Sequence, residues 1–505
     1  MNRPALVVGI LCLLQGALAD PRPDFGVQPK IPVSATVNIS FVEALVEVND
    51  ITNLPLNATL QLSNAKLQAV YNMIQTVLNQ TNTLTATFKY QELFTVDNGT
   101  ALAFANILTP IDNMVFYIQN TSLTDIIAPL NTSTQYQGIV DELIDEYGRL
   151  ALGLVQLKAE LVAVKTNLDS AVAANGNSTT ITASQLATYL KSAAVYKLVR
   201  AVNRVKAYLP VITYSLDTIY ENLIEANNFI VTLQAEVNAV PNSNATDYGA
   251  AYKVSSDAVE LNTTSGIAAS LSVSANLNTT LSAITNFTAT ANASTILTKL
   301  SGLATKNTSA LAATLTNEFN TTVFALRSFI GGKAQSINVT ADPNVQTLID
   351  VLMGNNFGYG RYCYHKYKEL MAGLFDNGLD AGFECTDKEA ERLTNLQSVI
   401  TALLVQIGFD TEDITTQVTL CAGLPAAQAS SCVASVTDYY VNLFDATSQK
   451  IDALYTFVTK EAIASRNRVL ICFALSYFQL AGGDASLISS NVLACSRDGP
   501  AGTTE

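Results

Sequence analysis

Apolar residues recur at alternating intervals of three and four in two long stretches of the chain. Because this spacing places apolar side chains on one narrow stripe of a helix, we predict two long α-helices with heptad seams. The first seam consists of Val140, Leu143, Tyr147, Leu150, Leu154, Leu157, Leu161, Val164 and Leu168. The second consists of Val195, Leu198, Val202, Val205, Leu209, Ile212, Leu216, Ile219, Leu223, Ala226, Ile230, Leu233, Val237 and Val240.

A turn signal separates the two seams. Residues 175–178 read Asn-Gly-Asn-Ser, which favours a turn, so we expect an antiparallel helical hairpin. The alternative is a pair of amphipathic helices in a globular bundle, which is also all-α. Pro210 interrupts the second seam and is expected to kink its helix, because proline lacks an N–H donor and crowds the preceding turn.

The remaining chain also has helical spacing, but with less regularity. Residues 34–130 predict shorter helices broken near Pro55, Asn98-Gly99, Pro110 and Pro129. Residues 242–340 are rich in Ser, Thr, Asn and Ala and predict either glycosylated helices or a partly ordered, repeat-like stretch. The fold class is therefore all-α, a bundle of long helical hairpins, with about two thirds of the residues in helices and negligible strand.

The N-terminus has the layout of a secretory signal. Arg3 precedes an apolar run from Leu6 to Leu14 and the cleavage pattern Ala-Leu-Ala at 17–19. We expect a signal peptide over 1–19 and an extended, proline-containing tail over 20–33. No other stretch reaches the roughly 18 apolar residues of a membrane span, so a secreted protein without a transmembrane segment is predicted.

Glycosylation signals and cysteines occupy separate parts of the mature chain. Fifteen Asn-x-Ser/Thr signals precede residue 341, and six cysteines follow residue 362. In the oxidising secretory pathway, the asparagines are expected to carry glycans and the cysteines to pair. The asparagines are Asn38, Asn57, Asn79, Asn98, Asn120, Asn131, Asn177, Asn244, Asn262, Asn278, Asn286, Asn292, Asn307, Asn320 and Asn338. The cysteines are Cys363, Cys385, Cys421, Cys432, Cys472 and Cys495.

These patterns divide the mature chain into four predicted parts after the tail. They are an N-glycosylated helical domain over 34–241, a heavily glycosylated segment over 242–340, a disulfide-stapled six-cysteine helical domain over 341–497 and a polar tail over 498–505.

The cysteine spacing is nearly symmetric about the short loop between Cys421 and Cys432. Two helices folded back on each other would bring partners level, so the spacing favours nested pairing. Sequential pairing of Cys363 with Cys385 is the alternative, provided that the glycines between them break the helix. Sequence alone does not select one connectivity. The nested pairs would be Cys363 with Cys495, Cys385 with Cys472, and Cys421 with Cys432.

Residues 355–497 resemble the TsetseEP domain of insect secreted proteins. The resemblance rests on Arg-Tyr-Cys-Tyr at 361–364, on Cys385, on the close pair at 421 and 432, and on two late cysteines. It implies a secreted insect protein. The family is named after a gut protein associated with immune response, and its Glu-Pro repeats are absent here. The resemblance transfers no functional residues.

Charge and composition exclude several classes of function. The formal charge of −14 becomes −15 without Arg3, and no basic cluster stands out, so binding to nucleic acid or anionic membranes by charge is not expected. His365 is the only histidine, which rules out a His-rich metal site. A Ser/His/Asp hydrolase would have to use it, and no Gly-x-Ser-x-Gly motif accompanies it.

Acidic groups and glycines provide no convincing site. The acids at 141, 142, 145 and 146, and those at 387, 389 and 391, are expected on solvated helix faces. Gly331-Gly332-Lys333 is expected to end a helix rather than bind phosphate. Glu412-Asp413 predicts a helix start capped by Thr411 or Asp410. We therefore expect no enzyme, no catalytic, cofactor-binding or metal-binding residue, and no cofactor.

The sequence favours a secreted, non-catalytic helical glycoprotein that acts by protein interaction or as an extracellular or luminal coat. By resemblance alone, its setting would be gut or immune. Its partner would be an extracellular protein or another copy of itself. The alternative is a carrier of lipid or another apolar ligand between long amphipathic helices, with Pro210 as a hinge. An unrecognised enzyme is the third hypothesis.

Overall fold

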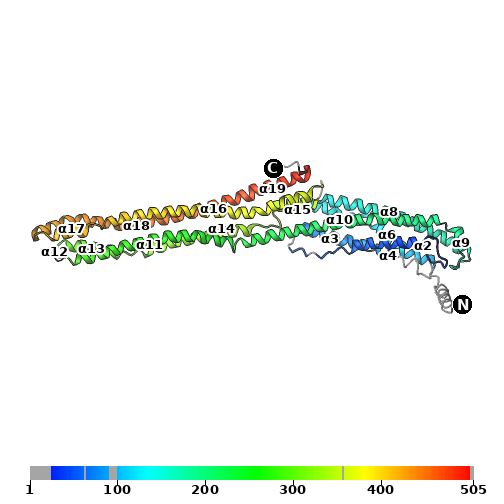
Figure 1. Cartoon of the computed structure of the whole chain (residues 1–505), viewed down its shortest axis with the longest axis horizontal. Coiled ribbons are helices and arrows are strands. Elements are labelled where there is room, and N and C mark those ends of the chain that lie inside the picture. Colours follow the sequence, from blue (N-terminus) through cyan, green and yellow to red (C-terminus); the bar gives the residue numbers. More distant parts are fainter. Residues whose placement is uncertain (1–23, 58, 62–63, 90–98, 355–357, 501–505) are drawn as a thin grey trace, which may run out of the picture. The chain divides into compact units, whose positions relative to one another are not determined.

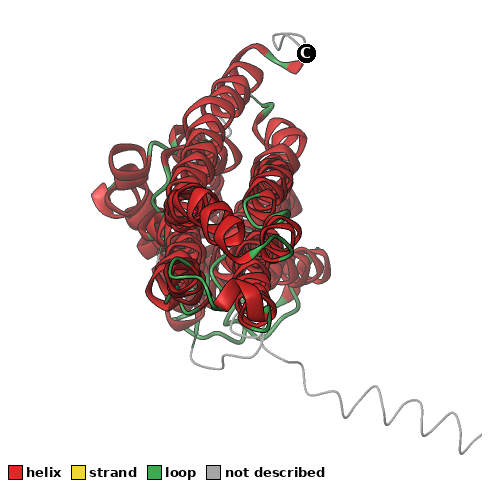
Figure 2. Cartoon of the chain, turned by 90° about the vertical axis from the view of Figure 1, so that its left-hand side faces the viewer, coloured by secondary structure: helices red, strands yellow, loops and turns green. Residues whose placement is uncertain are grey.

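The computed structural model describes residues 24–57, 59–61, 64–89, 99–354 and 358–500. Helices contain 86% of these residues, and strands contain none of them (Figure 2). An isolated bridge joins Asp24 and Val27. The all-α prediction is therefore confirmed, and the helix content exceeds the expected two thirds. The predicted signal peptide and Asn98 lie outside the described residues.

The chain divides into two compact units that do not follow its linear order. The first unit comprises Met1–Thr232, Thr340–Lys368 and Ser489–Glu505, and the second comprises Leu233–Val339 and Glu369–Ile488. The region predicted as one six-cysteine domain over 341–497 thus contributes to both units. The boundaries of the two units fall inside long helices of this region, because α16 (Gly360–Phe409) and α19 (Ala485–Asp498) each carry residues of both units.

The first unit is built from the N-terminal helices and three later segments. Gly99, with φ of 89°, precedes α6, and Pro129 ends α7, as predicted. The break expected at Pro110 is wrong, because α6 continues through it with Ile107 and Ile111 fully buried on either side. The elements are α2 (Ser34–Thr52), α3 (Ala65–Thr81), α4 (Leu84–Phe88), α6 (Thr100–Gln119), α7 (Thr121–Pro129), the π-helix η1 (Leu130–Thr134), α8 (Gln137–Ala174), α9 (Ala183–Tyr189), α15 (Pro343–Gly354) and parts of α10 (Ser192–Ala239), α16 (Gly360–Phe409) and α19 (Ala485–Asp498). All of them except α7 and η1 are labelled in Figure 1.

The two heptad seams pack as predicted. Every seam residue of α8 and of α10 is buried, and the last residue of the second seam, Val240, lies just beyond α10 and is half-buried. The helices run antiparallel, since Arg204 donates to Gln156 and Ser215 donates to Glu146. Helix α8 also packs against α6 and α15, so the hairpin belongs to a larger bundle. Pro210 lies inside α10 and does not end it.

Residues 24–33 differ from the expected extended tail. Phe25, Val27 and Ile31 are almost completely buried. The Ile31 N–H donates to the Asp24 carboxylate at 2.7 Å, and the Gln28 N–H donates to the Thr179 carbonyl at 3.0 Å. This segment therefore packs onto the rest of the first unit. Burial of its apolar side chains favours this packing more strongly than the neighbouring prolines favour an extended chain.

The second unit shows that the Ser/Thr/Asn/Ala-rich segment is helical. Several of its core positions are hydroxyl residues, which explains the irregular apolar spacing. Buried Thr263 donates to the Val259 carbonyl at 2.8 Å, so its hydroxyl is satisfied within its own helix. The elements are α11 (Asn244–Ser282), α12 (Thr285–Thr288), α13 (Ala293–Ala304), α14 (Ser309–Ser336), α17 (Ile414–Ala422), α18 (Ala426–Phe478), the π-helix η2 (Gln479–Asp484) and the remaining parts of α10, α16 and α19.

Two local predictions in this unit need correction. Gly331 and Gly332 lie within the last two turns of α14, which continues to Ser336, so they do not end the helix themselves. Helix α17 begins close to the predicted start, but its N-cap residue is Asp413, without a side-chain cap. Thr411 donates instead to the Gly408 carbonyl.

Candidate functional site

The six cysteines form three disulfides in the nested order that their spacing favoured. The Cα atoms are 5.8 Å apart in Cys363–Cys495 and in Cys385–Cys472, and 5.5 Å apart in Cys421–Cys432. The first bridge belongs to the first unit and the other two to the second. All six sulfurs are therefore bridged, which leaves no thiolate among them for catalysis or metal binding.

The single histidine lies in an exposed ion-pair cluster. His365 Nδ1 is 3.3 Å from Glu225 Oε1, and the side chain is 42% exposed. Lys368 donates to the same carboxylate oxygen at 3.0 Å. The described contacts of His365 are therefore those of a charged surface cluster, and they do not form the Ser/His/Asp arrangement of a hydrolase triad.

The expectation that all the acidic clusters lie on solvated faces is wrong for one residue in each cluster. Glu146 is 8% exposed and Glu389 is 1% exposed, whereas Asp141, Asp145, Asp387 and Glu391 are exposed. Each buried acid has a polar partner on a neighbouring helix of its own unit. These two carboxylates are functional candidates that the sequence analysis missed.

Glu389 is held by two arginines in the second unit. Arg468 of α18 donates three hydrogen bonds to its carboxylate, at 2.7 to 3.2 Å. Arg392 donates a further bond at 3.0 Å. Full pairing of a buried charge is typical of a structural ion pair, and both oxygens are occupied. The arrangement holds α16 against α18 and leaves no free oxygen for a substrate.

Glu146 lies between α8 and α10 in the first unit. Ser215 Oγ is 2.5 Å from Glu146 Oε1 and 2.9 Å from Glu142 Oε1, although a hydroxyl has only one hydrogen to donate. Burial, with smaller contributions from Glu142 and Asp145, raises the pKa of Glu146 to about 7, against opposing effects from Ser215 and Arg149. Protonated Glu146 would satisfy both contacts, because its hydroxyl can donate to Ser215 while Ser215 donates to Glu142.

We expect Glu146 to make the first unit more stable in mild acid. The folded-state pKa lies above the unfolded value of 4.5, so the stabilisation is fully present below pH 4.5 and is lost as pH rises through 7. At pH 8, Glu146→Gln should raise the free energy of unfolding by about 1 to 2 kcal/mol. Thermal unfolding from pH 5 to 8 measures this difference.

The matched control is Glu142→Gln, because Glu142 is less buried and shares the same hydroxyl. Burial also raises the pKa of Asp24 and of Asp350 in this unit, so the Glu146→Gln variant should retain part of the slope. Equal pH slopes in the wild type and Glu146→Gln would contradict the assignment.

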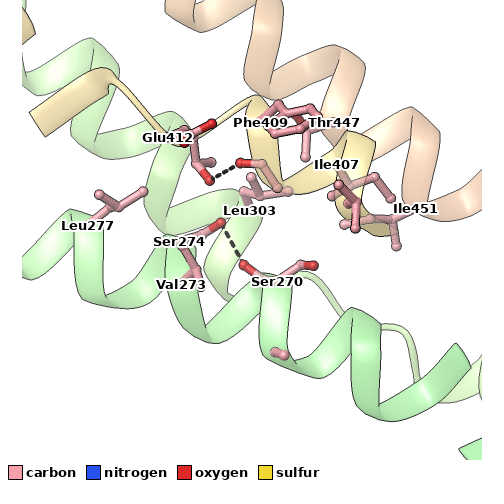
Figure 3. A pocket seen from close by; sticks show the side chains of 14 residues that line it. Ser270, Val273, Ser274, Leu277, Leu303, Ile407, Phe409, Glu412, Thr447 and Ile451 are labelled. Carbon is pink, nitrogen blue, oxygen red and sulfur yellow. Dashed lines mark hydrogen bonds between the residues drawn. The ribbon is translucent and has the colours of Figure 1, made fainter. Parts of the chain in front are cut away.

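A pocket of about 490 Å³ lies within the second unit (Figure 3). It is formed by α11, α13, the C-terminal end of α16 with the turn that follows, and α18. Its volume falls within the roughly 300 to 1,000 Å³ of small-molecule sites. Its apolar lining consists of Ala269, Val273, Leu277, Leu303, Val405, Ile407, Phe409 and Ile451. Its polar lining includes Ser270, Ser274, Thr411, Glu412 and Thr447.

The described asparagines of the glycosylation signals are all accessible to some extent. Nine are exposed and five are half-buried, and none of these fourteen is fully buried. Asn177 occupies the predicted tip, in the turn after α8, with φ of 66°. Two of these asparagines are engaged within the protein: the side-chain amide of Asn262 donates to the Gln397 carbonyl and to Thr401, and that of Asn286 donates to the Ala422 carbonyl.

Two helical stretches among the described residues have the length and apolar composition of a membrane span. They are Thr100–Gln119 and Ala426–Asp498, whose most apolar windows are 33% and 11% buried. The expectation that no such stretch exists was therefore too strict. Core helices of soluble proteins pass the same test, so length and composition alone assign no span.

Within the described residues, no group of three or more His, Cys, Asp or Glu side chains is placed to hold a metal ion. No family model, no curated protein and no solved structure matches this chain. The resemblance to the TsetseEP domain therefore stays a prediction. The candidates for function are the pocket and the apolar surfaces of the second unit.

Proposed function

We propose that the protein is a secreted, N-glycosylated, non-catalytic protein that acts by binding other proteins or a second copy of itself. Three disulfides are typical of an oxidising, extracellular environment, which supports secretion. The accessible asparagines support glycosylation. Both carboxylate oxygens of buried Glu389 are occupied by arginines, which supports a structural role for this acid and a binding role for the protein over catalysis.

One observation carries the interaction proposal: the helices without glycosylation signals expose large apolar side chains. No signal follows Asn338, so α16, α18 and α19 carry none. On α18, Ile471, Leu475 and Phe478 are 59%, 64% and 63% exposed. Their spacing of four and three residues places them on one helix face. We call these three residues the α18 stripe, and an exposed apolar stripe of this kind is typical of an interaction surface.

Leu475→Glu tests the α18 stripe. We expect the secreted protein to form dimers or larger complexes in sedimentation velocity, and chemical cross-linking to capture it with itself or another secreted protein. A carboxylate on the stripe should weaken that association about tenfold or more, because the charge would lose its hydration in an apolar interface.

The matched control is Leu261→Glu. Leu261 lies on α11 of the same unit, is 67% exposed and precedes the signal at Asn262. It should leave association unchanged. Equal losses in both variants, or a wild-type protein that neither self-associates nor cross-links, would contradict the proposal.

The pocket of the second unit supports a second candidate, the binding of an apolar ligand. Eight of its lining residues are apolar, and Ile407 and Leu303 are almost completely buried. This candidate needs no opening of long helices and no hinge at Pro210. Mass spectrometry of an organic extract of the secreted protein would detect a resident ligand.

A further inference from the structure

The hydroxyl hydrogens that line the pocket are already donated within the protein. Ser270 donates to the Gly266 carbonyl and Ser274 to the Ser270 carbonyl, each at 3.1 Å. Figure 3 draws the Ser274 bond along α11. Thr411 donates to the Gly408 carbonyl at 3.0 Å. These hydroxyls therefore present oxygen lone pairs to a ligand, which can accept hydrogen bonds.

Thr447 on α18 is committed in the same way. Its hydroxyl lies 2.7 Å from a carboxylate oxygen of Asp410 and 2.9 Å from the Leu443 carbonyl. Lys450 neutralises Asp410 at 2.7 Å, but Lys450 is not among the residues that line the pocket. Thr447 and Lys450 thus stabilise the wall of the pocket but offer no hydrogen-bond donor to a ligand inside the pocket.

The charge that lines the pocket is negative. Glu412 is the charged residue among the lining side chains, and no Lys, Arg or His is among them. Glu412 is exposed, as are Phe409 and Val405, which are 57% and 50% exposed. The rim therefore combines apolar surface with one carboxylate. An anionic ligand would lose water without gaining a donor and would meet this negative charge.

We propose that this pocket binds an apolar ligand that carries a hydrogen-bond donor, an alcohol or a primary amine, and discriminates against carboxylates of the same chain length. This inference rests on the second candidate function and specifies its ligand class. The apolar chain occupies the cavity between α11 and α18. The donor bonds to a hydroxyl lone pair such as that of half-buried Ser270, or to the Glu412 carboxylate.

Titration calorimetry of the full secreted protein with three ten-carbon probes tests the ligand class. Decan-1-ol and decylamine should bind, and decanoate should bind at least about tenfold more weakly at pH 7.4. Glu412→Gln should weaken decylamine about three- to tenfold, because it loses a charged partner, and should leave decan-1-ol nearly unchanged. Decanoate binding as tightly as decan-1-ol would overturn the ligand class while leaving apolar binding intact. Binding of none of the three would overturn the second candidate function itself.

Val273→Trp tests the location. Val273 lines the pocket and is 47% exposed, so a larger ring there should obstruct entry and lower affinity for decan-1-ol about tenfold or more. The control is Val254→Trp on the same helix, which is 72% exposed and outside the lining. The chain has no other tryptophan, so fluorescence of each variant also reports ligand contact. Wild-type affinity in Val273→Trp, with circular dichroism unchanged, would place the site elsewhere and overturn the assignment.

Discussion

Arg468→Met is expected to lower the free energy of unfolding of the second unit by about 3 kcal/mol. The reason is that Glu389 is only 1% exposed and receives three of its hydrogen bonds from Arg468. Arg392 alone cannot replace them, because it is 53% exposed and donates one bond. Chemical denaturation followed by circular dichroism measures the loss.

The control for Arg468→Met is Lys388→Met on the same helix as Glu389. Lys388 pairs with Glu384, but both side chains are more than half exposed, so the loss of stability should be far smaller than in Arg468→Met. The double variant Glu389→Met/Arg468→Met should recover most of the lost stability, since no unpaired charge remains buried. If Arg468→Met were as stable as the wild type, the burial of the Glu389 carboxylate would not depend on its ion pair with Arg468.

Loss of the Cys385–Cys472 disulfide should cost about 4 kcal/mol, and loss of Cys421–Cys432 about 3 kcal/mol, in Cys→Ala pairs. The two bridges lie in the same unit, with sequence separations of 87 and 11 residues. A bridge that closes a longer loop removes more conformational freedom from the unfolded chain, which sets the order. The midpoints of chemical denaturation of both variants give the comparison.

Each cysteine pair should be replaced together, because a single substitution leaves a free thiol that can exchange with other bridges. Greater destabilisation by loss of Cys421–Cys432 than of Cys385–Cys472 would contradict this order. It would indicate that the short bridge stabilises the turn between α17 and α18 by native-state packing.

Each regular part of the fold was predictable because a single pattern in the sequence determined it. Heptad spacing placed the seams of α8 and α10, and their residues are buried. The symmetric cysteine spacing favoured the nested pairing, and its middle bridge, Cys385–Cys472, joins α16 and α18, which keep one antiparallel register. Glu389 contacts Arg468, and Asp410 contacts Thr447. Asp410 follows Glu389 by the same number of residues by which Thr447 precedes Arg468, as a single antiparallel register requires.

The errors arose where tertiary packing overrode a local signal. Pro110 should break a helix, yet the buried residues on both sides keep α6 continuous. The hydroxyl-rich segment at 242–340 gave no clear periodicity, because Thr263 and its neighbours bury hydroxyls that bond to their own helix. A composition count treats such residues as polar, whereas their bonded hydroxyls fit a core.

The candidate sites were harder to predict because they depend on pairs from distant segments. Glu389 lies four residues before Leu393, so its register with the apolar seam was an available signal for burial. Its partner Arg468 had no such signal. The pocket combines residues of α11, α13, α16 and α18, and no local pattern in the sequence marks that combination.

Native mass spectrometry of the secreted protein, before and after enzymatic deglycosylation and again after organic extraction, is the most direct test of the proposed function. We expect a chain that starts near Asp20, lacks six hydrogens through three disulfides, carries N-glycans and occurs in protein complexes. Extra mass released by organic solvent would add the apolar ligand. An unglycosylated, monomeric chain with free thiols and no bound partner or ligand would show that the protein is not a secreted, interacting glycoprotein.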